Sequence, residues 1–246
     1  WSVLSGTAQP EMQRRAMASV ETHLVDHDTG LIKLLDPPLV NAMPSAGYIQ
    51  AYPPGVRENG GQYSHGAVWA LMAQAELAKG APARSDVREL PYRYFSYLSP
   101  AHRTQNGAHR SDYGLEPYVM AGDVYTQPPY VGRGGWSWYT GAAAWMHRAA
   151  IESLFGLQQT AEVLYFSPCL PAAWQRADLT LTREKKTMHF IFLQLGTTEA
   201  LDAVAPVAAT VLLPDEPLNW VSLATETHFV VPLIGHNAQS NSPKSQ

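Results

Sequence analysis

The feature that most constrains this fold is a pair of helical segments that are apolar around most of their circumference. Residues 62–79 and 137–155 carry apolar side chains on nearly every helical face. A helix with this pattern is buried on all sides, because a surface helix keeps one polar face. Both segments therefore need other elements around them, and 246 residues can provide one large domain, or one domain with a smaller second one.

Three other segments are also expected to be helical. An amphipathic helix over residues 9–26 follows from apolar side chains that recur every fourth residue. Further helical segments are expected at residues 84–98, with an interruption at Pro91, and at residues 113–125. Loops rich in proline and glycine separate these helices, at residues 36–61 and 127–135.

The pattern changes after Gly156, where the helical period gives way to short β-prone runs. Turn residues separate the runs, as they separate the strands of an antiparallel sandwich. The runs cover residues 163–166, 179–182, 188–193, 207–213 and 229–233. The sequence thus predicts a mainly α chain with a C-terminal β part, divided into residues 1–157, residues 158–236 and a disordered tail at 237–246.

Composition places the chain among ordinary globular proteins. Hydrophobic residues make up 46% and charged residues 15%, which suits a packed core. The formal net charge is -4 and no basic block stands out, which argues against nucleic-acid binding. No apolar run reaches the roughly 18 residues of a membrane span, and no signal-peptide pattern is present. The single Cys169 excludes a disulfide framework and suits the cytoplasm, while membrane attachment of a longer parent protein is left open.

The densest polar cluster covers residues 57–65, where two glycines precede a buried helix. Glycine lets backbone approach a ligand closely, and the N-terminus of a helix attracts anions. His65 is expected in the first helical turn, where an imidazole N–H can donate to a phosphate or sugar oxygen. A structural loop with a core histidine explains this cluster equally well when it is taken alone.

A second cluster, residues 133–141, repeats the same arrangement of a glycine-rich loop before a buried helix. Thr140 offers a hydroxyl and Gly141 an unobstructed N–H, and both suit an oxyanion. Tryptophan and tyrosine side chains in the same stretch suit sugar rings as well as core packing. The presence of two such clusters favours a shared pocket for an anion and a sugar.

Carboxylates near the clusters leave the catalytic chemistry open. An inverting glycosidase needs two of them about 6.5–9.5 Å apart. Glu116 and Asp123 fit structural roles better than catalytic ones. The histidines considered show no metal-ligand spacing, so no metal is predicted. They are His23, His27, His102, His109, His147 and His189.

Several long motifs closely resemble those of glycoside hydrolase family 94, and they follow one another in the order typical of that family. The longest contains the Glu-Asn-Gly-Gly sequence at Glu58. The match extends over about residues 1–195 and is closest to the cyclic β-1,2-glucan synthase and β-1,2-oligoglucan phosphorylase members. The motifs cover residues 47–49, 52–65, 116–119, 132–136, 138–143, 154–157 and 168–171, with Trp174.

The resemblance implies an (α/α)6 barrel, of which residues 1–157 would form the C-terminal half. It implies inverting phosphorolysis of β-glucosidic bonds, or the reverse synthesis, which gives an α-sugar 1-phosphate. The expected partners are a β-glucan or β-glucoside oligosaccharide and inorganic phosphate, with no other cofactor. By motif, phosphate would bind His65, Thr140 and Gly141, and the glucosyl unit would bind Arg57 and Glu58, with Gln62 nearby.

One departure from the family pattern affects catalysis. The general-acid Asp of the family lies in an upstream Asp-Trp-Asn-Asp type of segment, and these 246 residues contain none. We therefore expect a fragment that is inactive without the rest of its polypeptide. The alternatives are a carbohydrate-binding remnant without catalysis, and an inverting hydrolase that uses Glu58 with an aspartate such as Asp112.

Overall fold

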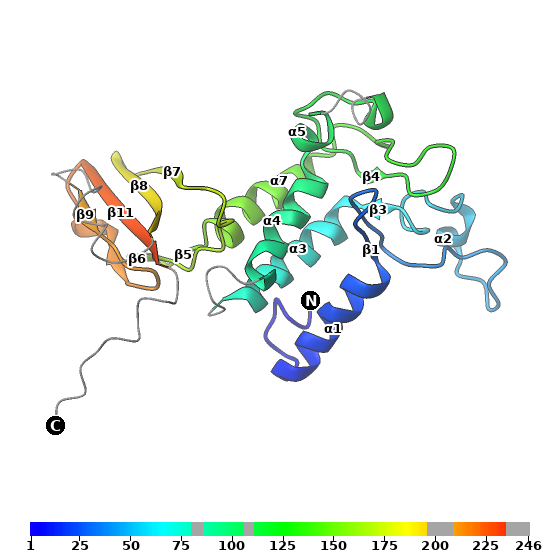
Figure 1. Cartoon of the computed structure of the whole chain (residues 1–246), viewed down its shortest axis with the longest axis horizontal. Coiled ribbons are helices and arrows are strands. Elements are labelled where there is room, and N and C mark those ends of the chain that lie inside the picture. Colours follow the sequence, from blue (N-terminus) through cyan, green and yellow to red (C-terminus); the bar gives the residue numbers. More distant parts are fainter. Residues whose placement is uncertain (80–85, 106–110, 196–208, 235–246) are drawn as a thin grey trace. The chain divides into compact units, whose positions relative to one another are not determined.

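The computed structural model describes residues 1–79, 86–105, 111–195 and 209–234. The chain divides into two compact units. The first comprises residues Trp1–Leu77 and Leu90–Ala150, and the second comprises Ala78–Glu89 and Ile151–Gln246. Helices dominate the described part of the first unit and strands that of the second (Figure 1).

The core of the first unit lies between three helices. These are α3 (Ser64–Ala78), α4 (Asp86–Leu98) and α7 (Thr140–Arg148). Figure 1 shows them side by side, and their buried side chains form one cluster that includes Leu71, Tyr94 and Ala142. Because α3 contacts neighbours on several faces, its circumference is apolar, as the sequence predicted.

The amphipathic helix predicted over residues 9–26 is confirmed as α1 (Pro10–His23), although it is shorter at its end, where Val25 and Asp26 form a strand. Its apolar side packs on α3, where buried Met17 contacts a small cluster with Val3 and Ala73. Two further short helices are α2 (Tyr48–Ala51) and α5 (Pro100–Arg103). Among the described residues, no helix is long and apolar enough to cross a membrane.

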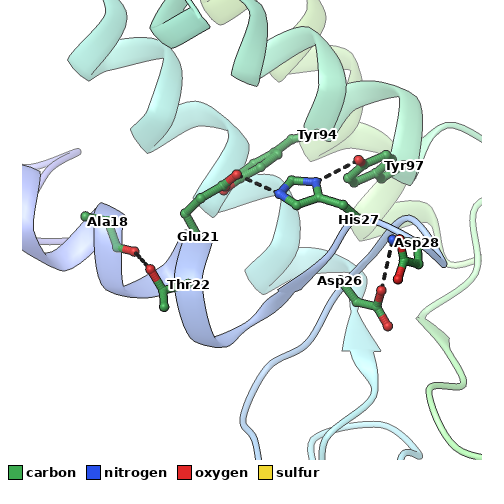
Figure 2. A network of polar contacts seen from close by, with 8 residues as sticks. All are labelled: Ala18, Glu21, Thr22, Asp26, His27, Asp28, Tyr94 and Tyr97. Atoms are coloured by element: carbon green, nitrogen blue, oxygen red, sulfur yellow. Dashed lines mark hydrogen bonds and ion pairs between the residues drawn. The ribbon is translucent and has the colours of Figure 1, made fainter.

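A polar network joins α1 to α4 (Figure 2). Glu21 of α1 accepts a hydrogen bond from the Tyr94 hydroxyl, and its other oxygen lies 2.8 Å from Nε2 of His27. Nδ1 of His27 lies 2.9 Å from the Tyr97 hydroxyl. The carboxylate thus links the helix to the turn that follows it and to the buried face of α4.

Four helix predictions need correction. Residues 113–125 were expected to be helical, but Gly114 has a φ of 66°, and the segment ends in the strand β4 (Asp123–Val124). Gln62 and Tyr63 form the strand β3 instead of a first helical turn. Helix α4 is continuous through Pro91, so the expected interruption is absent. The single helix expected over residues 137–155 consists of α7 followed by the π-helical segment η1 (Ala149–Leu154).

Two short strand pairs organise the loops of the first unit. Strand β1 (Val25–Asp26) pairs with β2 (Leu31–Ile32), and β3 (Gln62–Tyr63) pairs with β4; both pairs are antiparallel. The second pair joins segments that lie about sixty residues apart, and it brings the loop before α3 against the loop before α7.

The second unit contains two sheets of strands. An antiparallel sheet has the order β10-β6-β5, and a mixed sheet has the order β7-β8-β11-β9. Phe166 on the first sheet contacts Phe190 and Phe192 on the second, with ring centroids 4.7 and 5.2 Å apart. The strands are β5 (Leu157–Gln159), β6 (Val163–Phe166), β7 (Arg176–Arg183), β8 (Lys186–Leu195), β9 (Thr210–Val211), β10 (Leu218–Asn219) and β11 (Glu226–Ile234), with a 3₁₀ turn η3 (Trp220–Ser222).

The prediction of purely antiparallel strands is wrong for the larger sheet. Strand β7 runs antiparallel to β8, but β11 runs parallel to both β8 and β9. A parallel pair cannot be closed by a tight hairpin, so β8 and β11 are joined by a long connection. Part of the run at residues 207–213 and all of the tail at 237–246 lie outside the described residues.

Candidate functional site

The starts of α3 and α7 lie against each other in the first unit. His65 is in the first turn of α3, and Gly141 is in the first turn of α7. A Cβ atom placed on Gly141 would lie 3.0 Å from Cε1 and 3.1 Å from Nε2 of His65. Only glycine allows this approach without moving the imidazole, so two helix ends with positive partial charge meet at one point.

One extended segment anchors both helix starts. Ser64 donates its N–H to Gly122 O at 2.9 Å and its hydroxyl to Ala121 O at 2.6 Å. Tyr139, the N-cap of α7, donates its N–H to Met120 O at 3.0 Å and provides no side-chain cap. The first N–H groups of a helix have no partner within that helix, so those of α7 can face a ligand.

Aromatic rings surround His65. Its ring lies 6.1 Å from that of Tyr63, 5.5 Å from that of Tyr139 and 6.0 Å from that of Trp69. Burial lowers the pKa of His65 below its ordinary value, because desolvation disfavours the imidazolium. A neutral imidazole keeps one N–H donor, so His65 can bind an anion by a hydrogen bond.

The hydroxyls of Tyr63 and Tyr139 lie 3.3 Å apart beside His65. Their hydrogen bond and, after it, burial raise the pKa of Tyr63 to about 12. The Tyr63 phenol therefore stays protonated at neutral pH. One hydroxyl of the pair donates to the other, so one O–H is left to donate to an oxygen ligand. No local pattern in the sequence indicates the contribution of Tyr63, because its partner lies 76 residues away.

Arg57 and Glu58 lie together on the loop before β3. Arg57 Nε is 3.4 Å from Glu58 Oε2, and its guanidinium lies over the rings of Tyr52 and Trp136, 5.5 and 5.4 Å from their centroids. The backbone of Arg57 has a φ of 50°, which is unusual for a residue with a side chain. The pair offers one charged donor and one carboxylate acceptor, which suits the vicinal hydroxyls of a sugar.

Asp123 fixes this loop in place. Its side chain is buried, and it accepts hydrogen bonds from the backbone N–H of Arg57, at 2.7 Å, and from that of Trp136. Burial raises the pKa of Asp123, while both hydrogen bonds act against that rise. Asp123 therefore positions backbone from both predicted clusters, a structural role that the sequence favoured without indicating its partners.

Exposed aromatic side chains border the same loops. Tyr118 and Trp138 are in edge contact with centroids 6.2 Å apart, and Tyr48 contacts Tyr52 at 6.3 Å. Trp136 and Trp138 expose 68% and 63% of their surface. The flat faces of these exposed rings suit contact with sugar rings.

Other residues singled out in the sequence lie differently. Gln62 is 1% exposed, and its Oε1 accepts the Ile32 N–H at 2.8 Å, so it supports the loop, and a sugar contact by Gln62 stays a prediction. Asp112 is exposed beside Gly132, and Glu116 is exposed in a turn. The phosphate and sugar roles of the other residues also stay predictions.

Comparison with known proteins identifies the family. A model of the catalytic domain of the glycosyl hydrolase 94 superfamily matches residues 1–156, which is more than half of the chain. The chain belongs to this superfamily. The resemblance noted in the motifs is thereby confirmed for the first unit and the residues just after it.

Curated members of the superfamily agree with this assignment. A cyclic β-(1,2)-glucan synthase from Rhizobium meliloti is 41% identical over 174 residues, which cover 71% of this chain and 6% of the relative. A solabiose phosphorylase from Paenibacillus borealis is 29% identical over 73% of this chain and 22% of its own length. An N,N'-diacetylchitobiose phosphorylase from Vibrio furnissii is 27% identical, with 76% and 22% covered. The chain thus spans less than a quarter of each of these superfamily members.

Proposed function

We propose that the first unit forms the phosphate- and sugar-binding part of a catalytic site that performs inverting phosphorolysis of β-glucosidic bonds, or the reverse synthesis. The observation that carries this proposal is the meeting of two helix starts at His65 and Gly141 within a superfamily 94 catalytic domain. Several relatives are named as phosphorylases, which supports phosphate as the second substrate.

β-1,2-Linked glucan is the proposed sugar substrate. The relative with 41% identity is named as a cyclic β-(1,2)-glucan synthase, whereas the named phosphorylases are 29% identical or less. We also propose that α1, α3, α4 and α7 belong to an (α/α)6 barrel that other parts of the polypeptide complete. The reaction needs inorganic phosphate as co-substrate and no further cofactor.

In the proposed reaction, a phosphate oxygen attacks the anomeric carbon from the face opposite the glycosidic oxygen. The bond from carbon to the glycosidic oxygen breaks, and that oxygen takes a proton from a general-acid aspartate. The resemblance places this aspartate in a type of segment that these 246 residues do not contain. The product is α-glucose 1-phosphate, inverted at the anomeric carbon.

Residues of this chain bind and orient the two reactants. The His65 imidazole, the Thr140 hydroxyl and the Gly141 N–H donate to phosphate oxygens at the joined helix starts. Arg57 and Glu58 hold hydroxyls of the glucosyl unit, with Gln62 behind them. Holding both reactants at fixed positions converts a bimolecular step into an effectively unimolecular one.

Release of glucose 1-phosphate from β-1,2-glucan, with and without inorganic phosphate, tests the proposal. The assay compares this chain with the chain extended at its N-terminus by upstream coding sequence. We expect phosphate-dependent product only from the extended chain. Phosphate-independent release of free glucose, with water as the acceptor, would identify a hydrolase. Sugar binding without either product from either chain would identify a binding remnant.

His65→Gln in the extended chain tests the phosphate contact directly. A hydrogen bond to a charged group contributes about 1.5–3 kcal/mol, so the KM for phosphate should rise by about tenfold or more. The KM for glucan should change little. His147→Gln, at an exposed histidine of the same unit, is the matched control. An unchanged phosphate KM in His65→Gln would refute this role.

A further inference from the structure

The half-exposed face of the mixed sheet in the second unit carries a row of polar side chains across three strands. Thr180 on β7 pairs with His189 on β8, and His189 pairs with His228 on β11. Glu226 precedes His228 by two residues, so it lies on the same face of β11. The neighbouring Met188, Phe190 and Phe229 are buried on the opposite face.

The side chains in this row converge on one point. The rings of His189 and His228 are stacked, with centroids 4.6 Å apart and an interplanar angle of 13°. Glu226 Oε1 lies 3.5 Å from Nε2 of His189 and 3.6 Å from Nε2 of His228. One ligand atom from each of the three residues lies within 4.8 Å of those from the other two.

A fourth residue orients one of the two imidazoles. Thr180 Oγ1 lies 3.1 Å from Nδ1 of His189. When the hydroxyl accepts from Nδ1–H, Nε2 of His189 carries the free lone pair and faces Glu226. A histidine that binds a metal usually donates its other ring N–H to an oxygen in this way, which fixes the tautomer and the ring orientation.

We propose that His189, His228 and Glu226 bind a divalent transition-metal ion of the Zn²⁺ class. Two imidazole nitrogens and one carboxylate oxygen are ligands that Zn²⁺ accepts, at about 2.0–2.2 Å from the ion. The three side chains are exposed or half-buried, so small rotamer changes can draw their ligand atoms around one ion. The ion would join β8 to β11 and keep one position for water.

No pattern along the sequence indicates this metal site. His189 lies 39 residues before His228, and the prediction of no metal rested on spacing along the chain. The parallel pairing of β8 with β11 creates the contact, and that pairing was not predicted. All the residues of the site belong to the second unit, so the proposal is independent of the phosphate and sugar site.

Metal titration of the tag-free, EDTA-treated chain tests the proposal. Zn²⁺ binding is measured by calorimetry, and Co²⁺ binding by its visible absorption. We expect one equivalent of Zn²⁺ at a site that His228→Gln and Glu226→Gln each abolish, while His147→Gln binds as the unchanged chain does. Absence of Zn²⁺ binding, or binding that survives His228→Gln, overturns the proposal, since the residues would then form only a hydrogen-bonded cluster.

A second pair of variants tests the geometry without touching a ligand. Thr180→Val removes the hydroxyl beside His189 and keeps the side-chain shape. Loss of such a partner typically weakens metal binding by about 10–100-fold. Thr182→Val is the matched control, because Thr182 is exposed on the same face of β7 but pairs with Thr187. Equal Zn²⁺ affinities for Thr180→Val and Thr182→Val would contradict the proposed geometry.

Discussion

The two units hold their backbones in place by different means. In the first unit, long loops with little regular structure are fixed by buried polar side chains such as Asn59, Gln62 and Asp123. In the second unit, the strands form regular hydrogen-bonded ladders, and phenylalanine rings fill the space between them. The loops of the first unit thus depend on individual polar contacts, whereas the second unit depends on regular strand pairing and apolar packing.

Asn59 is the clearest example of the first kind. It is fully buried, and its Nδ2 donates to Leu39 O at 3.0 Å and to Tyr52 O at 2.8 Å. Its Oδ1 accepts the Leu39 N–H at 2.7 Å. One amide thus satisfies three backbone groups that a regular element would pair with its own backbone.

Phe190 is the corresponding example in the second unit. It is 1% exposed, and its ring lies 4.7 Å from that of Phe166 and 5.1 Å from that of Phe229. The backbone around it needs no help from side chains, because the ladder of β8 pairs on both sides. Variants of the second unit should therefore lose stability according to the apolar surface they leave unburied. Variants of the first unit should lose stability according to the polar contacts they remove.

Phe190→Ala should produce the largest effect on stability. Truncation of a buried phenylalanine typically costs about 3–5 kcal/mol, so the second unit should lose most of its protection from hydrogen exchange. Peptides around His65 and Asn59 should change much less. Ile191→Ala, at the half-exposed next position of the same strand, is the control and should cost less. Equal losses of protection from hydrogen exchange in both units would contradict the proposed difference in how the two units are stabilised.

Asn59→Ala should have a smaller and more local effect. It leaves buried backbone groups without partners, at a cost of about 1–3 kcal/mol for each group that stays dry. Hydrogen exchange should rise in residues 36–61, and the proposed binding of phosphate at His65 should weaken as the loop loosens. Asn59→Asp keeps the acceptor but faces two carbonyls with a carboxylate, so it should be at least as damaging. Protection unchanged in this loop would show that other contacts fix it.

The sequence predicted those parts of the molecule that depend on local pattern. The periodicity of α1 and the β-prone runs inside β6, β8 and β11 belong to this class. The two glycine-to-helix clusters were also visible, and the family motifs suggested roles for them that remain to be tested.

Features that depend on contacts between distant segments were missed. The pairing of β3 with β4 joins Tyr63 to Asp123, and no local pattern in either segment encodes it. The same holds for the parallel register of β11 on β8, which creates the cluster at His189 and His228. Asp123 was correctly favoured as structural, but only the fold identifies the backbone N–H of Arg57 as its partner.

The smallest expected effect concerns the pH dependence of stability in the first unit. His102 on α5 is half-buried, its Nδ1 has no hydrogen-bond partner within the described residues, and burial lowers its pKa below the ordinary 6.5. As pH falls below 6.5, the unfolded chain takes up a proton more readily than the folded one, so the unfolding free energy decreases. The loss continues until pH reaches the lowered pKa of the folded state.

His102→Gln should therefore flatten the decline of stability with falling pH, measured by urea unfolding at a series of pH values from about 7 to about 5. His65→Gln should act in the same direction, because burial also lowers the pKa of His65. If the slope of His102→Gln equalled that of the unchanged chain, burial of His102 would contribute nothing to acid sensitivity. The contrast between the units would then rest on the hydrogen bonds of Asn59 and its neighbours alone.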